Sequence, residues 1–185
     1  MPNQLPITTY GTEILRKNSK PLNDINGETI QLITDMFYTM RNADGIGLAA
    51  PQVNKSIDLI TIDISVIEEY QKEKPLVLIN PEIKEFYGEV LMSEGCLSIP
   101  DLHSEVLRPE KILVKYYDPD MKEINREYEG IWARVIQHEI DHLHGKLFID
   151  YLPKDELNKF RTLLKKIKSK KIETSYPIYN AKSQK

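Results

Sequence analysis

The stretch GIWARVIQHEIDHL, residues 130–143, predicts the central helix of this 185-residue chain. Its apolar residues recur at helical spacing, and Gly145 follows closely, as a glycine commonly does at the end of a helix. The residues expected to anchor the helix in the core are Trp132, Ile136, Ile140 and Leu143. On the face that carries His138, the residues Ile131 and Val135 predict an apolar wall.

Within this helix, Gln137-His138-Glu139-Ile140-Asp141-His142 contains an H-E-x-x-H motif. The two histidines are four residues apart, so their imidazoles project from one face, one turn apart. Two imidazoles in that arrangement can bind one cation. Glu139 points about 100° away from His138 around the helix, so it can reach a water beside the metal without binding the metal itself. We therefore assign Glu139 as the candidate general base.

A catalytic metal usually has three protein ligands, so a third ligand must come from elsewhere in the chain. Cys96 is the favoured candidate, because it is the sole cysteine, follows a predicted strand and stands beside a glycine. Glu156 or Glu173 would instead complete the ligand set of a thermolysin-like metalloprotease. His144 is a poor candidate, since its position on the helix has turned away from the ligand face. The residues alone leave these alternatives open.

Apolar periodicity predicts further elements around this helix. A helix is expected over residues 28–41 with Asn26 as a possible cap, and strands over 57–64, 76–79, 89–93 and 112–117, the second closed by Asn80-Pro81. A short apolar run, 147–151, precedes a helix from 154 to about 168. The expected fold class is α+β, with antiparallel β-sheets around the central helix and an additional C-terminal helix. Residues 1–170 are expected to form a single catalytic domain, and residues 171–185 a lysine-rich, mobile tail.

Composition narrows the class of protein. With 41% hydrophobic residues, 29% charged residues and a net charge of −3, neither disorder nor bulk attraction to nucleic acid is expected. The first ten residues lack the basic-then-apolar pattern of a secretory signal, and nowhere do 18 apolar residues follow one another. We therefore expect a cytoplasmic protein that binds neither DNA nor a membrane. A single cysteine also excludes an internal disulfide.

Three segments together resemble peptide deformylases of the bacterial type that lacks the large insertion. They are Gly45-Ile46-Gly47-Leu48-Ala49-Ala50-Pro51-Gln52, Glu94-Gly95-Cys96-Leu97-Ser98 and Gln137-His138-Glu139-Ile140-Asp141-His142. They match the family patterns G-x-G-L-A-A-x-Q, E-G-C-L-S and Q-H-E-x-D-H in the same order. The likeness runs from about Ile7 to Leu152. It implies a metal-dependent hydrolase that removes the N-formyl group from the N-terminal formylmethionine of newly synthesised polypeptides and releases formate.

The resemblance also implies roles for individual residues. Cys96, His138 and His142 would be the ligands of a single divalent ion, with Glu139 as general base and acid. Gln52 and the backbone N–H of Leu97 would stabilise the oxyanion. The residues that would contact the substrate are Ile46, Gly47, Met92, Gly95, Ile131 and Val135. Glu94 and Arg108 would form a salt bridge that braces the cysteine loop.

The identity of the metal is implied by the resemblance more than by the ligands. Imidazole and thiolate ligands suit zinc. The family nevertheless implies Fe(II) in the cell, with Zn(II), Ni(II) or Co(II) able to occupy the same site. The chain departs from close bacterial relatives at His103, where they often carry an arginine that contacts the peptide. Preferences beyond the first substrate residues therefore stay open.

A basic stretch near the C-terminus supports a hypothesis of another class. Its residues are Lys159, Arg161, Lys165, Lys166, Lys168, Lys170 and Lys171. A solvated helix face explains them without any function. Alternatively, the chain could be a non-catalytic metal-binding or ribosome-binding module. In related bacterial enzymes a C-terminal helix docks near the ribosomal exit tunnel, so catalysis and ribosome docking are compatible.

Overall fold

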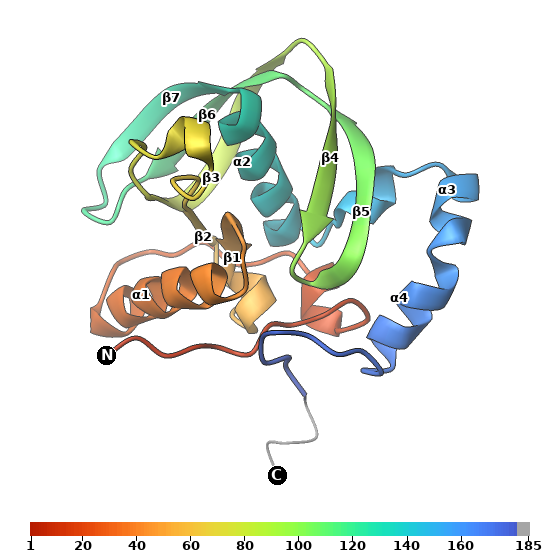
Figure 1. Ribbon diagram of the computed structural model, residues 1–185. Helices are drawn as coiled ribbons and strands as arrows, with labels where there is room; N and C mark the ends of the chain where they lie inside the picture. Colours follow the sequence, from red (N-terminus) through yellow and green to blue (C-terminus); the bar gives the residue numbers. More distant parts are fainter. Residues whose placement is uncertain (181–185) are drawn as a thin grey trace.

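The structure, a computed structural model, describes residues 1–180 (Figure 1). Helix α2 (Gly130–Leu143) runs through the middle of the molecule, between a five-stranded sheet and a separate two-stranded hairpin. Its bounds are those that the sequence predicts, and every residue from Ala133 to Leu143 is buried. The predicted fold class, antiparallel sheets around a central helix with a further C-terminal helix, is confirmed.

The larger sheet has the strand order β1-β2-β3-β6-β7, and each neighbouring pair is antiparallel. Its strands are β1 (Gly47–Ala49), β2 (Leu59–Ile62), β3 (Leu76–Tyr87), β6 (Lys111–Tyr117) and β7 (Glu123–Glu129). The hairpin consists of β4 (Val90–Cys96) and β5 (Ile99–Arg108). The other α-helices are α1 (Gly27–Asn42), α3 (Lys154–Lys159) and α4 (Arg161–Lys168). Short 3-10 turns include η2 (Ala50–Val53) and η4 (Phe148–Tyr151).

Two apolar clusters form much of the core, and the first of them packs α2 against the larger sheet. One lies between α2 and the larger sheet and includes Ile60, Ile62, Leu78, Val114, Ile136 and Ile140. The other lies beneath the hairpin and the C-terminal helices and includes Leu102, Val106, Phe148, Leu164 and Ile167. Full burial of one such side chain contributes about 1.5–3 kcal/mol. The helix that carries the H-E-x-x-H motif is therefore fixed in position by the core.

Helix α1 also follows the prediction. The side chain of Asn26 accepts a hydrogen bond from the backbone N–H of Thr29 at 3.0 Å, which satisfies one free donor at the start of the helix. Met36 and Met40 are buried against the sheet side of the core.

Other elements differ from the sequence expectation. β3 continues beyond Asn80-Pro81 to Tyr87, because a register shift between Ile79 and Glu82 accommodates the proline, which cannot donate a ladder hydrogen bond. Strands β1, β5 and β7 were not predicted from the sequence. The predicted helix from residue 154 is two helices, α3 and α4, separated at Phe160.

Part of the predicted tail packs against the body of the protein. Ile178 forms a parallel bridge with Ile7, and Tyr176 is only 9% exposed. The reason is that this otherwise polar stretch contains apolar side chains that join a buried cluster near the N-terminus. Residues 181–185, the rest of the predicted tail, lie outside the described residues. Within residues 1–180, no helix has the length and apolarity needed to cross a membrane.

Candidate active site

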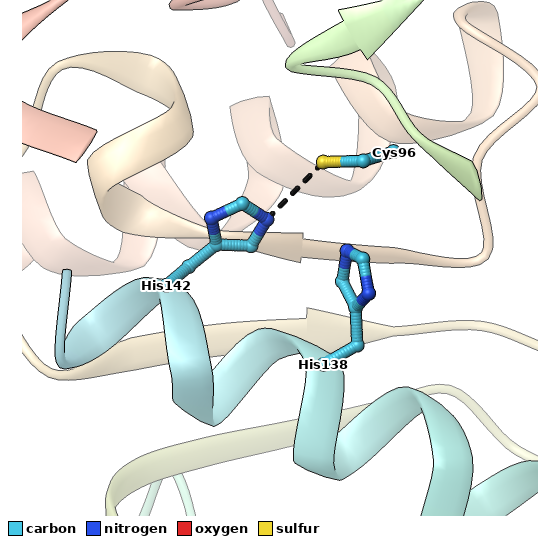
Figure 2. Close-up of side chains that lie close together, drawn as sticks. All are labelled: Cys96, His138 and His142. Atoms are coloured by element: carbon cyan, nitrogen blue, oxygen red, sulfur yellow. Dashed lines mark hydrogen bonds between the residues drawn. The ribbon is translucent and has the colours of Figure 1, made fainter. Parts of the chain in front are cut away.

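The side chains of Cys96, His138 and His142 converge on one point (Figure 2). Their potential ligand atoms all lie within 4.8 Å of one another, and Cys96 Sγ lies 3.2 Å from His142 Nε2. The histidines occupy successive turns of α2, and the cysteine ends β4. The structure thus brings together the three residues that the resemblance implies as ligands.

The alternative ligands lie elsewhere. Glu156 hydrogen-bonds to the hydroxyl of Ser104, whereas Glu173 and His144 are exposed. Among residues 1–180, the cluster of potential metal ligands consists of the cysteine and the two motif histidines. The ligand set of a thermolysin-like protease is therefore not assembled here.

This donor set fits a divalent transition-metal ion. A thiolate and two imidazoles provide three protein ligands and leave a further coordination position open. His138 Nδ1 lies 2.9 Å from Glu94 Oε2, which leaves its Nε2 for a metal. Glu139 Oε2 is buried and has no hydrogen-bond partner among the described residues. An unpaired buried carboxylate oxygen beside three ligand atoms is what a site for a metal and a reacting water requires.

The electrostatics of the two histidines favour a positive charge at this point. Burial alone would lower the pKa of His138, but its hydrogen bonds with Cys96 and Glu94 outweigh burial and raise that pKa well above the ordinary value. Burial, together with the charge of His138, lowers the pKa of His142 well below the ordinary value. The site therefore stabilises one positive charge among its ligand atoms, which a bound cation would supply.

A buried ionic network supports His138 from behind. Glu94 accepts hydrogen bonds from Arg108 Nε at 2.6 Å and from Arg134 Nη1 at 2.6 Å, in addition to its contact with His138. Arg108 Nη1 also donates to Asp141 Oδ2 at 2.6 Å. Burial alone would raise the pKa of Glu94, but the hydrogen bonds from His138 and Arg108 outweigh burial and lower it. Glu94 is therefore ionised and fixes the orientation of the imidazole.

Glu94 and Arg108 were expected from the sequence, whereas Arg134 was not. This arginine is 3% exposed, and besides Glu94 it donates to the carbonyl oxygens of Val106 at 2.8 Å and Val90 at 2.7 Å. It thereby ties both strands of the hairpin to α2. The available signal was an arginine between Ala133 and Val135 in a helix predicted to be buried, since an arginine is rarely buried without partners.

Glu139 stands where the larger sheet meets the metal ligands. It is 4% exposed, and its carboxylate lies against Gly47 of β1. A Cβ atom added at Gly47 would lie 2.5 Å from Glu139 Oε1, so a glycine is needed at this close approach. Burial raises the pKa of Glu139 to about 7. A carboxylate with a pKa near neutrality can both accept and return a proton.

Two candidate oxyanion donors lie beside Cys96. Gln52 is 1% exposed, and its Oε1 accepts a hydrogen bond from the N–H of Ala49 at 2.7 Å. Its Nε2 consequently faces Ser98 Oγ at 3.3 Å and Cys96 Sγ at 3.7 Å. Leu97 occupies the turn between β4 and β5, and within the described part of the chain its backbone N–H donates to no protein acceptor. Both groups can thus donate a hydrogen bond to an oxygen atom of a ligand.

Gln52, Cys96, Leu97, His138 and Glu139 border one cleft of about 390 Å³. Of the predicted substrate contacts, Ile46, Gly47, Gly95, Ile131 and Val135 line the cleft. Met92 is not among the lining residues; it lies opposite Val106 within the hairpin, and its contact with the substrate stays a prediction. It shares a strand face with Glu94 but lies farther along β4 from the metal ligands. The lining residues that the sequence did not single out include Arg134 and Tyr176.

Comparison with known proteins gives one consistent result. A family model described as polypeptide deformylase matches residues 4–158. The chain is 47% identical over 180 residues to a peptide deformylase of Chlorobium phaeovibrioides, covering 97% of this chain and 95% of that relative. It is 45% identical over 174 residues to a peptide deformylase of Prosthecochloris aestuarii, covering 94% of each.

Solved structures agree with the sequence relatives. A crystal structure of a peptide deformylase from Legionella pneumophila has a TM-score of 0.83 and 40% identity, covering 91% of this chain and 98% of that chain. A peptide deformylase from Synechococcus elongatus, crystallised in complex with actinonin, has a TM-score of 0.79 and 42% identity, covering 85% of each chain.

Proposed function

Because the chain belongs to the polypeptide deformylase family, we propose that Cys96, His138 and His142 hold its catalytic metal and that Glu139 is its general base. The protein is a metal-dependent hydrolase that removes the N-formyl group from the formylmethionine of newly synthesised polypeptides. The observation that carries the residue assignment is the convergence of three ligand atoms within 4.8 Å, beside a buried carboxylate oxygen that lacks a partner.

The reaction divides between the metal and the residues of the cleft. When bound, a divalent ion supplies Lewis-acid chemistry, polarising a carbonyl and lowering the pKa of water. Glu139 accepts a proton from the water that attacks the formyl carbon, and returns this proton to the amine when the C–N bond breaks. Gln52 Nε2 and the N–H of Leu97 hold the carbonyl oxygen as negative charge develops on it. The products are formate and a free N-terminal methionine.

The cleft supports binding of a methionine side chain and a peptide backbone. Ile46, Ile131 and Val135 line it with apolar groups, which suit an unbranched thioether. Gly47 and Gly95 add no side chain to the lining, which leaves room for the main chain of a peptide. We assign these five residues to substrate binding.

The buried network around Glu94 acts on the metal ligands by holding His138. Glu94, held by Arg108, fixes the tautomer and orientation of His138. We add Arg134 to this network because it shares the same carboxylate oxygen with Arg108. Loss of either arginine would leave buried charge without its partner.

For the metal we propose Fe(II) in the cell, with Zn(II), Ni(II) or Co(II) able to replace it. The donor set supports a transition metal of this group and does not choose among them. We further propose that residues 1–170, together with the stretch up to residue 180 that packs on them, act as one catalytic domain in the cytoplasm.

A second proposal concerns the basic stretch around α4. This helix buries Leu164 and Ile167, while Lys165, Lys166 and Lys168 are exposed. An exposed basic face supports docking on ribosomal RNA near the exit tunnel. Replacing these three lysines with glutamate should abolish co-sedimentation with ribosomes and leave deformylation of a free peptide unchanged. Co-sedimentation of this triple variant with ribosomes at low salt would contradict the proposal.

The direct test of the function uses Fe(II)-loaded protein prepared without oxygen. It should release formate from a formyl-methionyl peptide and leave the matched acetyl-methionyl peptide intact. Absence of formate from fully metal-loaded protein would refute the assignment. Release of formate by a Cys96→Ala variant with no bound metal would refute the metal site while retaining the activity.

A further inference from the structure

Segments from the two ends of the described chain lie side by side (Figure 1). The N–H of Ile7 donates to the carbonyl of Pro177 at 2.8 Å, and the N–H of Tyr179 donates to the carbonyl of Ile7 at 2.8 Å. We call residues 7–10 and 172–180 together the terminal layer. Its C-terminal part belongs to a stretch that the sequence analysis assigned to a tail.

The terminal layer contacts both donor segments through its backbone. The N–H of Thr8 donates to the carbonyl of Gln52 at 2.7 Å, and the N–H of Tyr10 donates to the carbonyl of Ser98 at 2.8 Å. Ser98 follows Leu97 in the two-residue turn between β4 and β5. The layer therefore supports the segment that carries Gln52 and the turn that carries the Leu97 N–H.

Tyr176 completes these contacts with a side chain. Its hydroxyl donates to the carbonyl oxygen of Leu97 at 2.8 Å, and its ring packs with Ile7 and Ala43 in a buried cluster that Leu97 also contacts. Thr174 Oγ1 donates to the backbone carbonyl of Tyr176 at 2.6 Å, which restrains the tyrosine. Tyr176 also lines the cleft, so this contact is at the site and not remote from it.

We propose that Tyr176 is a positioning residue for the reaction: by holding the carbonyl of Leu97, it fixes the Leu97 N–H where the oxyanion develops. The inference rests on the proposed function, which makes this N–H an oxyanion donor. Around Leu97, the carbonyl of Ser98 is held by Tyr10 and the Ser98 hydroxyl by Gln52. The carbonyl of Leu97 itself depends on the Tyr176 hydroxyl. Without that hydroxyl, the φ and ψ angles of Leu97 gain freedom, and its N–H loses a fixed direction.

The variant Tyr176→Phe removes the hydroxyl and keeps the buried ring. Outright removal of an oxyanion donor lowers kcat by about 10²- to 10³-fold, so loosening one of two donors should lower kcat less, about 5- to 20-fold. KM for a short formyl-methionyl peptide should stay near the wild-type value, because the hydroxyl holds the protein and not the methionine side chain. A matched control is Tyr179→Phe, since within the described chain the Tyr179 hydroxyl makes no hydrogen bond.

Hydrogen exchange at the Leu97 amide gives a second readout that does not depend on turnover. In the full-length, metal-loaded protein, exchange at this amide should be faster in Tyr176→Phe than in the wild type and in Tyr179→Phe. A wild-type kcat in Tyr176→Phe would overturn the proposal, as would unchanged amide exchange. A fall in kcat that merely follows a fall in bound metal would also overturn it. If the wild-type protein itself releases no formate, the proposed function fails, which is a separate outcome.

Discussion

Replacing Gly47 with alanine perturbs the general base without touching a metal ligand. A Cβ atom at this position would lie 2.5 Å from Glu139 Oε1 and 2.7 Å from Val135 Cγ1. Ordinary contacts of this kind are about 3.5–4.0 Å, so the carboxylate of Glu139 or strand β1 must move by roughly 1 Å. Both neighbouring side chains are buried, and space for such a movement is limited.

The expected magnitude follows from these contacts. Overpacking of a buried site typically lowers the free energy of unfolding by about 1–3 kcal/mol. A displacement of about 1 Å in a catalytic group can lower turnover by about 10²-fold. Gly47→Ala should therefore lose about two orders of magnitude in kcat with a modest loss of stability. Its metal content should stay at the wild-type level, because Glu139 is not assigned as a ligand.

The assay measures formate release, bound metal and the unfolding midpoint on one preparation of each variant. Gly27→Ala is the matched control, because a Cβ atom at Gly27 meets nothing within 4 Å. This control should retain wild-type turnover. A Gly47→Ala variant with wild-type kcat would refute the placement of Glu139 against β1. Loss of the metal would show that the displaced carboxylate supports the ion.

Three further predictions concern the metal and the buried carboxylate. Cys96→Ala should lose tight metal binding, whereas Glu156→Ala, which lies outside the ligand cluster, should keep it; metal analysis showing the reverse would exclude the cysteine as a ligand. The iron-loaded enzyme should lose activity in air and the nickel-loaded enzyme should lose it more slowly, because Fe(II) and a thiolate are both open to oxidation; equal lifetimes would count against Fe(II). In metal-free protein, the pKa of Glu139 is raised from 4.5 to about 7. Between these two pH values the folded state binds more protons than the unfolded state, so the free energy of unfolding falls as the pH rises from 4.5 to about 7. In denaturant titrations from about pH 4 to about pH 8, the free energy of unfolding of Glu139→Gln should therefore rise relative to that of the wild type by up to about 3 kcal/mol. If the free energies of unfolding of the two proteins changed in parallel with pH, the prediction would be contradicted.

The sequence was most informative where local pattern and chemistry coincide. Helix α2 was predicted with its observed bounds because apolar spacing and the H-E-x-x-H motif occur in the same 14 residues. Helix α1 was predicted with its cap because the hydrogen bond from Thr29 to Asn26 is local. Neither prediction required knowledge of a distant contact.

Strand β5 was missed although burial alternates from Pro100 to Arg108. Its buried positions include Ser104 and Arg108, and its exposed positions include Leu107, so burial and hydrophobicity do not coincide. β7 was missed because it is almost entirely polar and has one buried residue, Tyr128. In both strands the backbone pairing, and not the composition, determines the structure.

The residues missed at the site share another property: they act through partners far away in sequence. Arg134 bonds to Glu94 and to the carbonyls of Val90 and Val106, and Tyr176 bonds to the carbonyl of Leu97. No periodicity signals a side chain that holds a distant backbone carbonyl. Motif matching finds the groups assigned to the chemistry, whereas the groups that position them become visible in three dimensions.

The most direct test of the central claim is the Glu139→Gln variant, measured for bound metal and for deformylation on the same preparation. Glutamine keeps the size of the side chain but cannot accept the proton. The variant should hold a full complement of metal and bind the formyl-methionyl peptide, while turnover falls by at least about 10²-fold. Loss of the metal would make Glu139 a ligand, and near-normal turnover with full metal would remove it from catalysis.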